Sequence, residues 1–176
     1  SGHSFGNLFI AAMTQVTGDV ETALKESSKV LAVKGQVLPA SKEFVRLDAI
    51  MEDGTVVCGE SHIPEAHKRI HRVKLYPEHA EAVQSSLDAI RNAEAIVLGP
   101  GSLYTSVIPN LLVEGIGDAI CRSKAVKIYI CNVMTQPGET DGYTASMHVK
   151  AIMDHAGRNA VDYVIVNSTP VPDDLK

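Results

Sequence analysis

The sequence predicts a single α/β domain over residues 1–176, with a mainly parallel sheet and a β-hairpin insertion around residues 43–59. Three short runs in the second half of the chain are apolar at nearly every position and rich in β-branched residues: 95–98, 126–131 and 161–166. Helical patterns alternate with these runs, which is typical of parallel strands joined by right-handed crossovers. Because the runs lack a polar side, we expect each strand to be covered on both faces.

The first part of the chain carries helical periodicity. Apolar residues crowd positions 8–16 and predict a buried helix, which the polar side chain of Ser4 or Asn7 can open as a cap. Over positions 20–31 apolar residues recur at spacings of three and four, while charged residues fill the opposite side. This pattern predicts a second, amphipathic helix that Gly35 ends.

A period of two then replaces the helical period. Apolar and polar residues alternate over 45–50, and a second run returns over 55–58 after an acidic turn with glycine, which together predict the hairpin. An irregular polar stretch leads to a short strand at 73–76. Pro77 suits the first position of the next helix, whose apolar stripe runs over 80–90.

The composition is that of a globular protein without a general affinity for nucleic acid or membranes. Sixteen Lys and Arg against 21 Asp and Glu give a net charge of −5, so an anionic ligand must be held locally. No apolar run approaches the roughly 18 residues that a membrane-spanning helix needs. Three widely spaced cysteines favour a reducing compartment over a disulfide framework. We therefore expect a cytoplasmic protein with neither a nucleic-acid partner nor membrane insertion.

Ligands of open parallel sheets bind outside the carboxyl ends of the strands, so the loops that follow the three strands are the candidate site. The first loop contains Gly99, Gly101 and Ser102, and a helix starts near Thr105. The glycines allow close approach of the backbone, and a helix start attracts an anion, which suits a phosphate or diphosphate. The alternative is a plain tight turn between strand and helix.

The second loop spans thirteen residues, 132–144, and is rich in hydrogen-bonding side chains and glycine. A loop of this length at the carboxyl end of a strand is longer than a connection requires. Tyr143 can stack on a base or sugar, and Glu139 or Asp141 can bind a ribose hydroxyl or a metal. Alternatively, Asp141 or Thr144 only caps the following helix.

Two further patterns carry weaker indications. The segment Gly2 to Gly6 matches the nucleophile elbow of serine hydrolases, with Ser4 as nucleophile, but no buried strand precedes it, and Ser4 can instead be a helix cap. The segment 60–74 contains several histidines and basic residues, but their spacing matches no closed zinc site. A solvated face or a subunit contact explains this segment equally well, so we predict no metal ligand there.

Four motifs together resemble one family. They are GHSFGNL at 2–8, VKGQVLPA at 33–40, GPGSLYTSVIPN at 99–110 and MTQPGETDGYT at 134–144. The chain resembles the gluconeogenesis factor family (YvcK type), which is related to 2-phospho-L-lactate transferase (CofD). The resemblance covers essentially the whole chain, and the last two motifs are long enough to be specific.

The resemblance implies a Rossmann-like three-layer fold and a cytoplasmic protein that binds nucleotide sugars such as UDP-N-acetylglucosamine. It also implies a role in growth on gluconeogenic carbon sources and in the regulation of cell shape, without an assigned catalytic residue. The implied ligand-binding residues lie in a polar helix start, a diphosphate-facing turn and a nucleotide-side loop: His3, Ser4 and Asn7; Gly99, Gly101 and Ser102; Thr135, Glu139, Thr140, Asp141 and Tyr143.

The alternative function is that of the transferase relatives, which move a phospholactyl group from a guanosine diphosphate donor to a deazaflavin with the help of Mg²⁺. The family's glycine-rich first strand-turn-helix and its acidic pair have no counterpart in this sequence, nor does its C-terminal tail. Met147 stands where an acidic residue is expected. A non-catalytic regulator is therefore the leading hypothesis, as part of a longer domain, and a second copy of the chain is a candidate partner.

Overall fold

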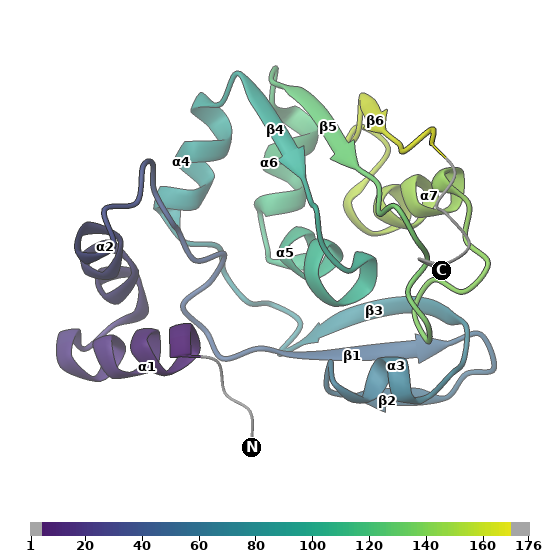
Figure 1. Ribbon diagram of the computed structural model, residues 1–176, viewed down its shortest axis with the longest axis horizontal. Helices are drawn as coiled ribbons and strands as arrows, with labels where there is room; N and C mark the ends of the chain where they lie inside the picture. The colour runs from purple at the N-terminus through teal and green to yellow at the C-terminus, as the bar shows by residue number, and fades with distance from the viewer. Residues whose placement is uncertain (1–4, 170–176) are drawn as a thin grey trace.

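The computed structural model describes residues 5–169 and contains two three-stranded sheets flanked by helices (Figure 1). The first sheet is antiparallel with the order β2-β1-β3, and the second is parallel with the order β4-β5-β6. The strands are β1 (Arg46–Met51), β2 (Val56–Cys58), β3 (Ile70–Tyr76), β4 (Ala95–Leu98), β5 (Val126–Ile130) and β6 (Tyr163–Ile165). The helices are α1 (Phe5–Thr17), α2 (Val20–Val30), α3 (His62–Glu65), α4 (Gln84–Asn92), the π-helix η1 (Leu103–Val107), α5 (Ile108–Leu112), α6 (Ile116–Arg122) and α7 (Ala145–Ala156).

The parallel sheet confirms the three predicted strands, but its faces differ from the expectation. Side chains alternate across it, so that Leu98 and Tyr129 point to the buried face while Val97, Tyr163 and Ile165 point to the other. The latter three are 51%, 65% and 56% exposed. The prediction that the strands are covered on both faces is therefore wrong for residues 5–169, because their helices cover one face only.

The same observation limits the predicted three-layer arrangement. Helices α4, α6 and α7 pack beside one another, and α7 contacts the buried face of the sheet through the hydrogen bond between His148 and Tyr129. The described residues thus form a parallel sheet with one helical layer. Continuous apolar strands indicated burial, but a strand sequence does not say which segment supplies its cover.

The antiparallel sheet confirms the predicted hairpin. Strand β1 pairs with β2 in a register that places Asp48 opposite Cys58, and with β3 in a register that places Arg46 opposite Tyr76. The Arg46 guanidinium donates two hydrogen bonds, of 2.8 and 3.0 Å, to the buried Asp48 carboxylate and thereby lowers the pKa of Asp48. Strand β3 is longer than the predicted 73–76, and the short helix α3 interrupts the stretch expected to be irregular.

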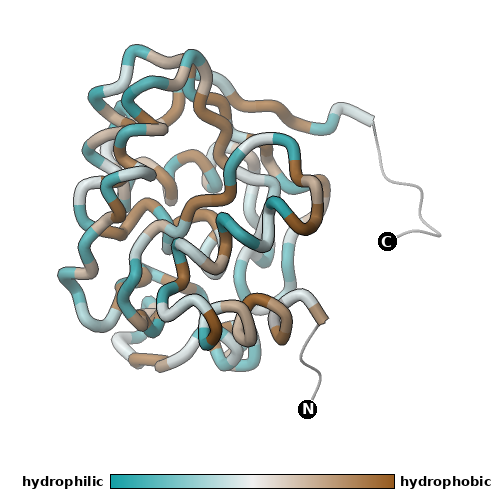
Figure 2. The backbone as a smooth tube through the Cα atoms, turned by 90° about the vertical axis from the view of Figure 1, so that its left-hand side faces the viewer, coloured by the Kyte–Doolittle hydropathy of each residue, from teal (hydrophilic) through white to brown (hydrophobic). Residues whose placement is uncertain are grey.

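Helix α1 is present where the sequence predicts it, but it is not buried. Phe5, Leu8 and Val16 are exposed, and α1 packs against α2 at one end of the molecule. Figure 2 shows hydrophobic residues along this helix. The segment is apolar, but its burial depends on which other segments of the fold pack against it.

Two predicted helix boundaries are also wrong. Helix α2 ends at Val30, and Ala32 adopts a positive φ of 49° just beyond it, three residues before Gly35. Helix α4 begins at Gln84, so that Pro77 lies in the preceding loop instead of the first helical turn. Gly35 and Pro77 each permit a helix boundary without requiring one, so neither residue fixed the position of the boundary.

The two sheets share one hydrophobic core. It contains residues from the antiparallel sheet and from the helices that follow β4 and β5: Leu47, Met51, Val73, Leu103, Ile108 and Ile152. Within the described part of the chain, no helix combines the length and apolarity needed to cross a bilayer.

A histidine connects α7 to the edge of the antiparallel sheet. The Val73 N–H on β3 donates to Nε2 of His155 at 3.1 Å, and Nδ1 of His155 lies 2.7 Å from the Ala151 carbonyl oxygen. A neutral imidazole satisfies both contacts, with Nδ1 as donor and Nε2 as acceptor. Burial lowers the pKa of His155, and Arg72 and His71 add to this effect, whereas Asp154 and the Ala151 carbonyl oppose it.

We expect the substitution His155→Phe to lower the free energy of unfolding by about 1–3 kcal/mol at pH 7.5, because the Val73 N–H loses its acceptor. The lowered pKa means that the unfolded chain binds a proton more readily than the folded one below pH 6.5. Wild-type stability should therefore fall as the pH drops below about 6.5, and the variant should show a shallower dependence. Urea unfolding at pH 7.5 and 5.5 measures both effects. His155→Gln, which keeps an acceptor, is the control, and equal pH dependence in the wild type and in His155→Phe contradicts the assignment.

Candidate functional site

The loops that follow β4, β5 and β6 meet at one edge of the parallel sheet, as the sequence predicts. A cavity of about 190 Å³ opens there. Its polar lining comes from the ends of β5 and β6 and from the start of α7: Asn132, Thr135, Tyr143, His148 and Asn167. Of these, Thr135 and Tyr143 were predicted site residues, so the structure brings part of the predicted set together.

The turn after β4 is built from glycines that no other residue can replace without strain. Gly99 has a φ of +88°, and a Cβ there would lie 3.2 Å from the Ile130 carbonyl oxygen. The Asn132 side chain donates to the Gly101 carbonyl oxygen at 3.0 Å. This hydrogen bond fixes the turn, which includes Ser102, directly beside the cavity. The predicted diphosphate-facing turn and the predicted nucleotide-side loop are therefore neighbours.

Glu139 lies between the two loops and is only 3% exposed. Its Oε1 accepts hydrogen bonds from Thr105 Oγ1 at 2.9 Å and from Gln136 Nε2 at 2.8 Å, while Oε2 is buried without a hydrogen-bond partner. Burial raises the pKa of Glu139, although Thr105 and the backbone N–H groups of Tyr104 and Thr105 oppose that shift. The start of η1, where the sequence suggested an external anion, thus faces a carboxylate of the protein itself.

The other two predicted polar residues of the loop hold its shape. Thr140 is buried, and its hydroxyl accepts from the Gln136 N–H at 2.8 Å. Asp141 accepts from the Gly138 N–H at 2.7 Å. Thr144, not Asp141, caps α7, with its hydroxyl accepting from the Met147 N–H. The structure therefore places Glu139, Thr140 and Asp141 in the loop framework and leaves Thr135 and Tyr143 on the cavity.

Tyr143 separates the candidate site from a second cavity of about 230 Å³ between β3 and α7. Its hydroxyl lies 2.9 Å from the hydroxyl of the buried Tyr104, and the two rings meet edge to face. Burial and the contact with Tyr143 both raise the pKa of Tyr104. The edge of the Tyr143 ring also meets His148, with 5.6 Å between ring centroids. Tyr143 is consequently fixed on one side and faces the cavity on the other.

Three predicted site residues belong to the start of the chain. His3 and Ser4 lie outside the described residues, so their predicted roles, including that of Ser4 as a nucleophile, stay predictions. Asn7 belongs to α1, and Figure 1 shows α1 and α2 at the end of the molecule opposite α7 and the loop 132–144. Sequence reasoning gave no site role to Asn132 or Asn167, although both follow a predicted strand directly, which is the signal that could have identified them.

The described residues contain no cluster of three metal-ligating side chains. Over residues 5–169, no three His, Cys, Asp or Glu side chains come together in a way that could hold a metal ion. In the segment 60–74, the side chain of His62 contacts the backbone, because its Nδ1 lies 3.0 Å from the Cys58 carbonyl oxygen.

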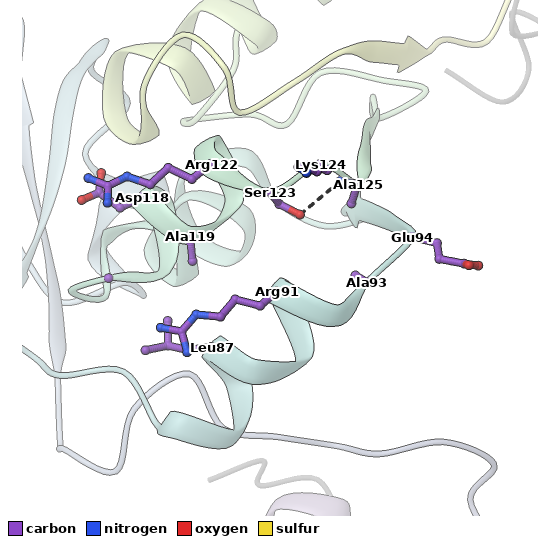
Figure 3. Close-up of a pocket in the computed structure, with 11 residues that line it drawn as sticks. Leu87, Arg91, Ala93, Glu94, Asp118, Ala119, Arg122, Ser123, Lys124 and Ala125 are labelled. Atoms are coloured by element: carbon purple, nitrogen blue, oxygen red, sulfur yellow. Dashed lines mark hydrogen bonds between the residues drawn. The ribbon is translucent and has the colours of Figure 1, made fainter.

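A larger cavity, of about 700 Å³, lies at the opposite edge of the sheet between α4 and α6. Figure 3 shows Arg91, Asp118 and Arg122 around it and Glu94 pointing away. These charges are of both signs, and Arg91 already pairs with Asp88 at 3.0 Å. Because ligands of parallel sheets bind at the carboxyl ends of the strands, we place the candidate site at the smaller cavity.

The fold and the site define an α/β protein with a polar cleft at the carboxyl edge of a parallel sheet. Residues 1–176 match the model of the family described as 2-phospho-L-lactate transferase CofD. The chain belongs to this family.

Its relatives include proteins named gluconeogenesis factor. The gluconeogenesis factor of Halalkalibacterium halodurans is 58% identical over 176 residues, which cover all of this chain and 55% of that relative. The gluconeogenesis factor of Bacillus subtilis (strain 168) is 55% identical over 176 residues, which cover all of this chain and 56% of that relative. A crystal structure of a UPF0052 family protein from Bacillus halodurans, 58% identical, superposes with a TM-score of 0.94 over 98% of this chain and 56% of that one. The chain thus spans about half the length of these relatives.

Gly138 shows how closely the second loop approaches the rest of the fold. It has a φ of +78°, and a Cβ added there would overlap the backbone of Pro64 in α3. Gly142, in the same loop, has a similar φ of +70° but nothing within 4 Å of an added Cβ. The two glycines therefore share a left-handed backbone conformation and differ in the space around them.

This difference yields a matched pair of variants. We expect Gly142→Ala to cost about 1–2 kcal/mol of stability, because an alanine in the left-handed region is strained. Gly138→Ala should cost more, since the loop must also move away from Pro64. Urea unfolding of both variants measures the two costs. Equal losses would show that the loop does not pack against α3 as described.

Proposed function

We propose that this chain forms the ligand-binding part of a nucleotide-sugar-binding gluconeogenesis factor. In this proposal it binds UDP-N-acetylglucosamine in the cytoplasm and regulates growth on gluconeogenic carbon sources and cell shape without catalysis. The observation that carries it is the cleft in which Asn132, Thr135 and Tyr143 lie beside the Gly99–Ser102 turn. The relatives named gluconeogenesis factor, at 58% and 55% identity, support the gluconeogenesis part of this proposal.

The contacts suggest how the ligand is divided between the two loops. The diphosphate is proposed to lie along the Gly99–Ser102 turn, which the hydrogen bond from Asn132 to the Gly101 carbonyl oxygen holds beside the cavity. Because Glu139 already occupies the start of η1, the diphosphate is placed on the turn and not over that helix end. The nucleoside then extends into the cavity and packs on the exposed side of Tyr143.

A transferase of the CofD kind is the second candidate, favoured by the description of the family model. The same turn and loop would steady a guanosine diphosphate donor. Formation of product from a phospholactyl guanosine diphosphate donor and a deazaflavin, in the presence of Mg²⁺, would favour it over the regulator.

The first test is a calorimetric titration of the protein at its full natural length with UDP-N-acetylglucosamine. We expect saturable binding that excess UDP suppresses, because both molecules place a diphosphate on the Gly99–Ser102 turn. GDP serves as the competing ligand for the transferase alternative. No heat with the nucleotide sugar and no competition by UDP would refute the proposed function.

The second test concerns Tyr143. We expect Tyr143→Ala to weaken UDP binding roughly tenfold or more, since stacking on an aromatic ring contributes about 1–3 kcal/mol per base. Tyr143→Phe loses the contact with Tyr104 but keeps the ring, so its affinity should stay close to that of the wild type. His79→Ala, on an exposed side chain, is the control. Unchanged affinity in Tyr143→Ala would remove the stacking role.

A further inference from the structure

Two acidic side chains are buried in the part of the chain that the structure describes, and their surroundings are opposite. Asp48 is 4% exposed and accepts two hydrogen bonds from the Arg46 guanidinium. Glu139 is 3% exposed, and no Lys, Arg or His side chain within residues 5–169 forms an ion pair with it. A buried carboxylate without a cation is costly, because burial removes the water that stabilises its charge. Glu139 is therefore the buried acid whose charge these residues leave uncompensated.

The hydrogen bonds of Glu139 stabilise its charged form on one side only. Oε1 accepts from the Thr105 hydroxyl at 2.9 Å and from the Gln136 side-chain amide at 2.8 Å, whereas Oε2 is buried without a hydrogen-bond partner. Burial raises the pKa of Glu139, and only the Thr105 hydroxyl and the N–H groups of Tyr104 and Thr105 oppose that shift. The protonated and ionised forms are thus closer in free energy than those of an exposed glutamate, and a nearby negative charge favours the protonated form.

The elements packed against the loop 132–144 carry few other ionisable groups. They are Tyr104 on η1, His62 and Glu65 on α3, His148 on α7, and Asp141 and Tyr143 in the loop itself. Tyr104 and His148 are neutral near pH 7, because burial raises the pKa of Tyr104 and lowers that of His148. His62, Glu65 and Asp141 are exposed, so solvent screens their charges. None of these groups is a buried cation that offsets the charge of Glu139.

The Gly99–Ser102 turn, on which the diphosphate is proposed to lie, leads directly into η1. The Ser102 carbonyl oxygen accepts from the N–H groups of Ser106 and Val107 at 3.0 and 2.9 Å, so the turn and the helix form one unit. Thr105, which donates to Glu139, belongs to the first turn of that helix. A diphosphate on the turn therefore adds negative charge beside a buried carboxyl group that has no cation. Repulsion between like charges raises the pKa of that carboxyl group.

We propose that Glu139 makes ligand binding proton-linked, so that the nucleotide sugar binds preferentially when Glu139 is protonated and its binding is accompanied by the uptake of one proton. The proton comes from the solvent and is bound by the Glu139 carboxyl group, while the ligand itself is unchanged. This inference rests on the proposed function, because it needs the diphosphate on the Gly99–Ser102 turn. Coupling between two binding sites is reciprocal, so a ligand that favours the protonated form binds more tightly when the pH falls.

Calorimetric titration of the protein at its full natural length with UDP-N-acetylglucosamine tests the inference. Each phosphate of this probe is esterified and carries a single charge, so the probe does not titrate near neutral pH. Titrations in buffers with different enthalpies of ionisation count the protons taken up. We expect uptake of up to one proton per ligand between pH 5.5 and 8. The affinity should fall with rising pH, by at most about tenfold per pH unit, because one proton is exchanged.

Glu139→Gln is the principal variant, because it keeps the shape of the side chain and removes the titrating group. It should bind the nucleotide sugar without the uptake of that proton and with a flatter dependence of affinity on pH. Glu65→Gln removes an exposed carboxylate from α3 and is the matched control, which should keep both properties of the wild type. Equal proton uptake in Glu139→Gln and the wild type assigns the proton to another group, such as His148, and overturns the inference.

Thr105→Val tests the same group from the opposite direction. The Thr105 hydroxyl stabilises the charged form of Glu139, so its loss should raise the pKa of Glu139 further and move the proton uptake to higher pH. Infrared difference spectra give a readout that does not depend on affinity. The carbonyl band of a protonated carboxyl group should appear when the wild type binds the nucleotide sugar, and it should be missing in Glu139→Gln.

The outcomes separate this inference from the proposed function. If the wild type binds the nucleotide sugar without proton uptake at any pH between 5.5 and 8, the role of Glu139 is wrong while the proposed function stands. If Thr105→Val takes up its proton over the same pH range as the wild type, the proton is not on Glu139 and the inference is overturned. If neither the nucleotide sugar nor UDP binds at any pH, the proposed function fails and this inference fails with it.

Discussion

The burial of the Glu139 carboxylate between two loops is the constraint on which the candidate site depends. Oε1 of Glu139 accepts hydrogen bonds from Thr105 and Gln136, and Oε2 has no hydrogen-bond partner. Burial raises the pKa of this carboxyl group. Such a group is costly in an apolar interior, and the hydrogen bonds offset part of that cost. The hydrogen bond between Thr105 and Glu139 fixes η1 and the loop 132–144 to each other, so that the Gly99–Ser102 turn stays beside Tyr143.

Contacts with α3, β3 and β5 also hold the elements of the candidate site in place. Gly138 brings the loop against α3, His155 attaches α7 to the edge of β3, and Tyr129 connects β5 to α7 through His148. The first two of these contacts join elements that are distant in the sequence, and the third joins the consecutive elements β5 and α7. The loop 132–144 and helix α7 therefore pack against the antiparallel sheet and α3, and a substitution at one of these contacts should alter the geometry of the cleft.

Periodicity predicted most of the elements because it reflects the local geometry of strands and helices. It identified the hairpin, the three parallel strands and the edge at which their loops meet, and so it indicated the loop that contains Tyr143, whereas Thr135 was implied by the family resemblance. It could not show that Glu139 points inward, since an acidic side chain in a loop has the same pattern whether it binds a ligand or another loop. Proline and glycine misplaced two helix boundaries for a similar reason: Pro77 and Gly35 permit a boundary without requiring one.

The sequence by itself determined the α/β class, the order of the strands along the chain and the carboxyl-edge location of the cleft, because these follow from short-range patterns and the handedness of crossovers. Only the tertiary structure decided which polar residues face the cleft. It moved Glu139, Thr140 and Asp141 into the loop framework and brought Asn132, His148 and Asn167 to the cavity. It also showed that residues 5–169 leave one face of the parallel sheet open. Burial and facing depend on contacts between distant segments, which no local pattern contains.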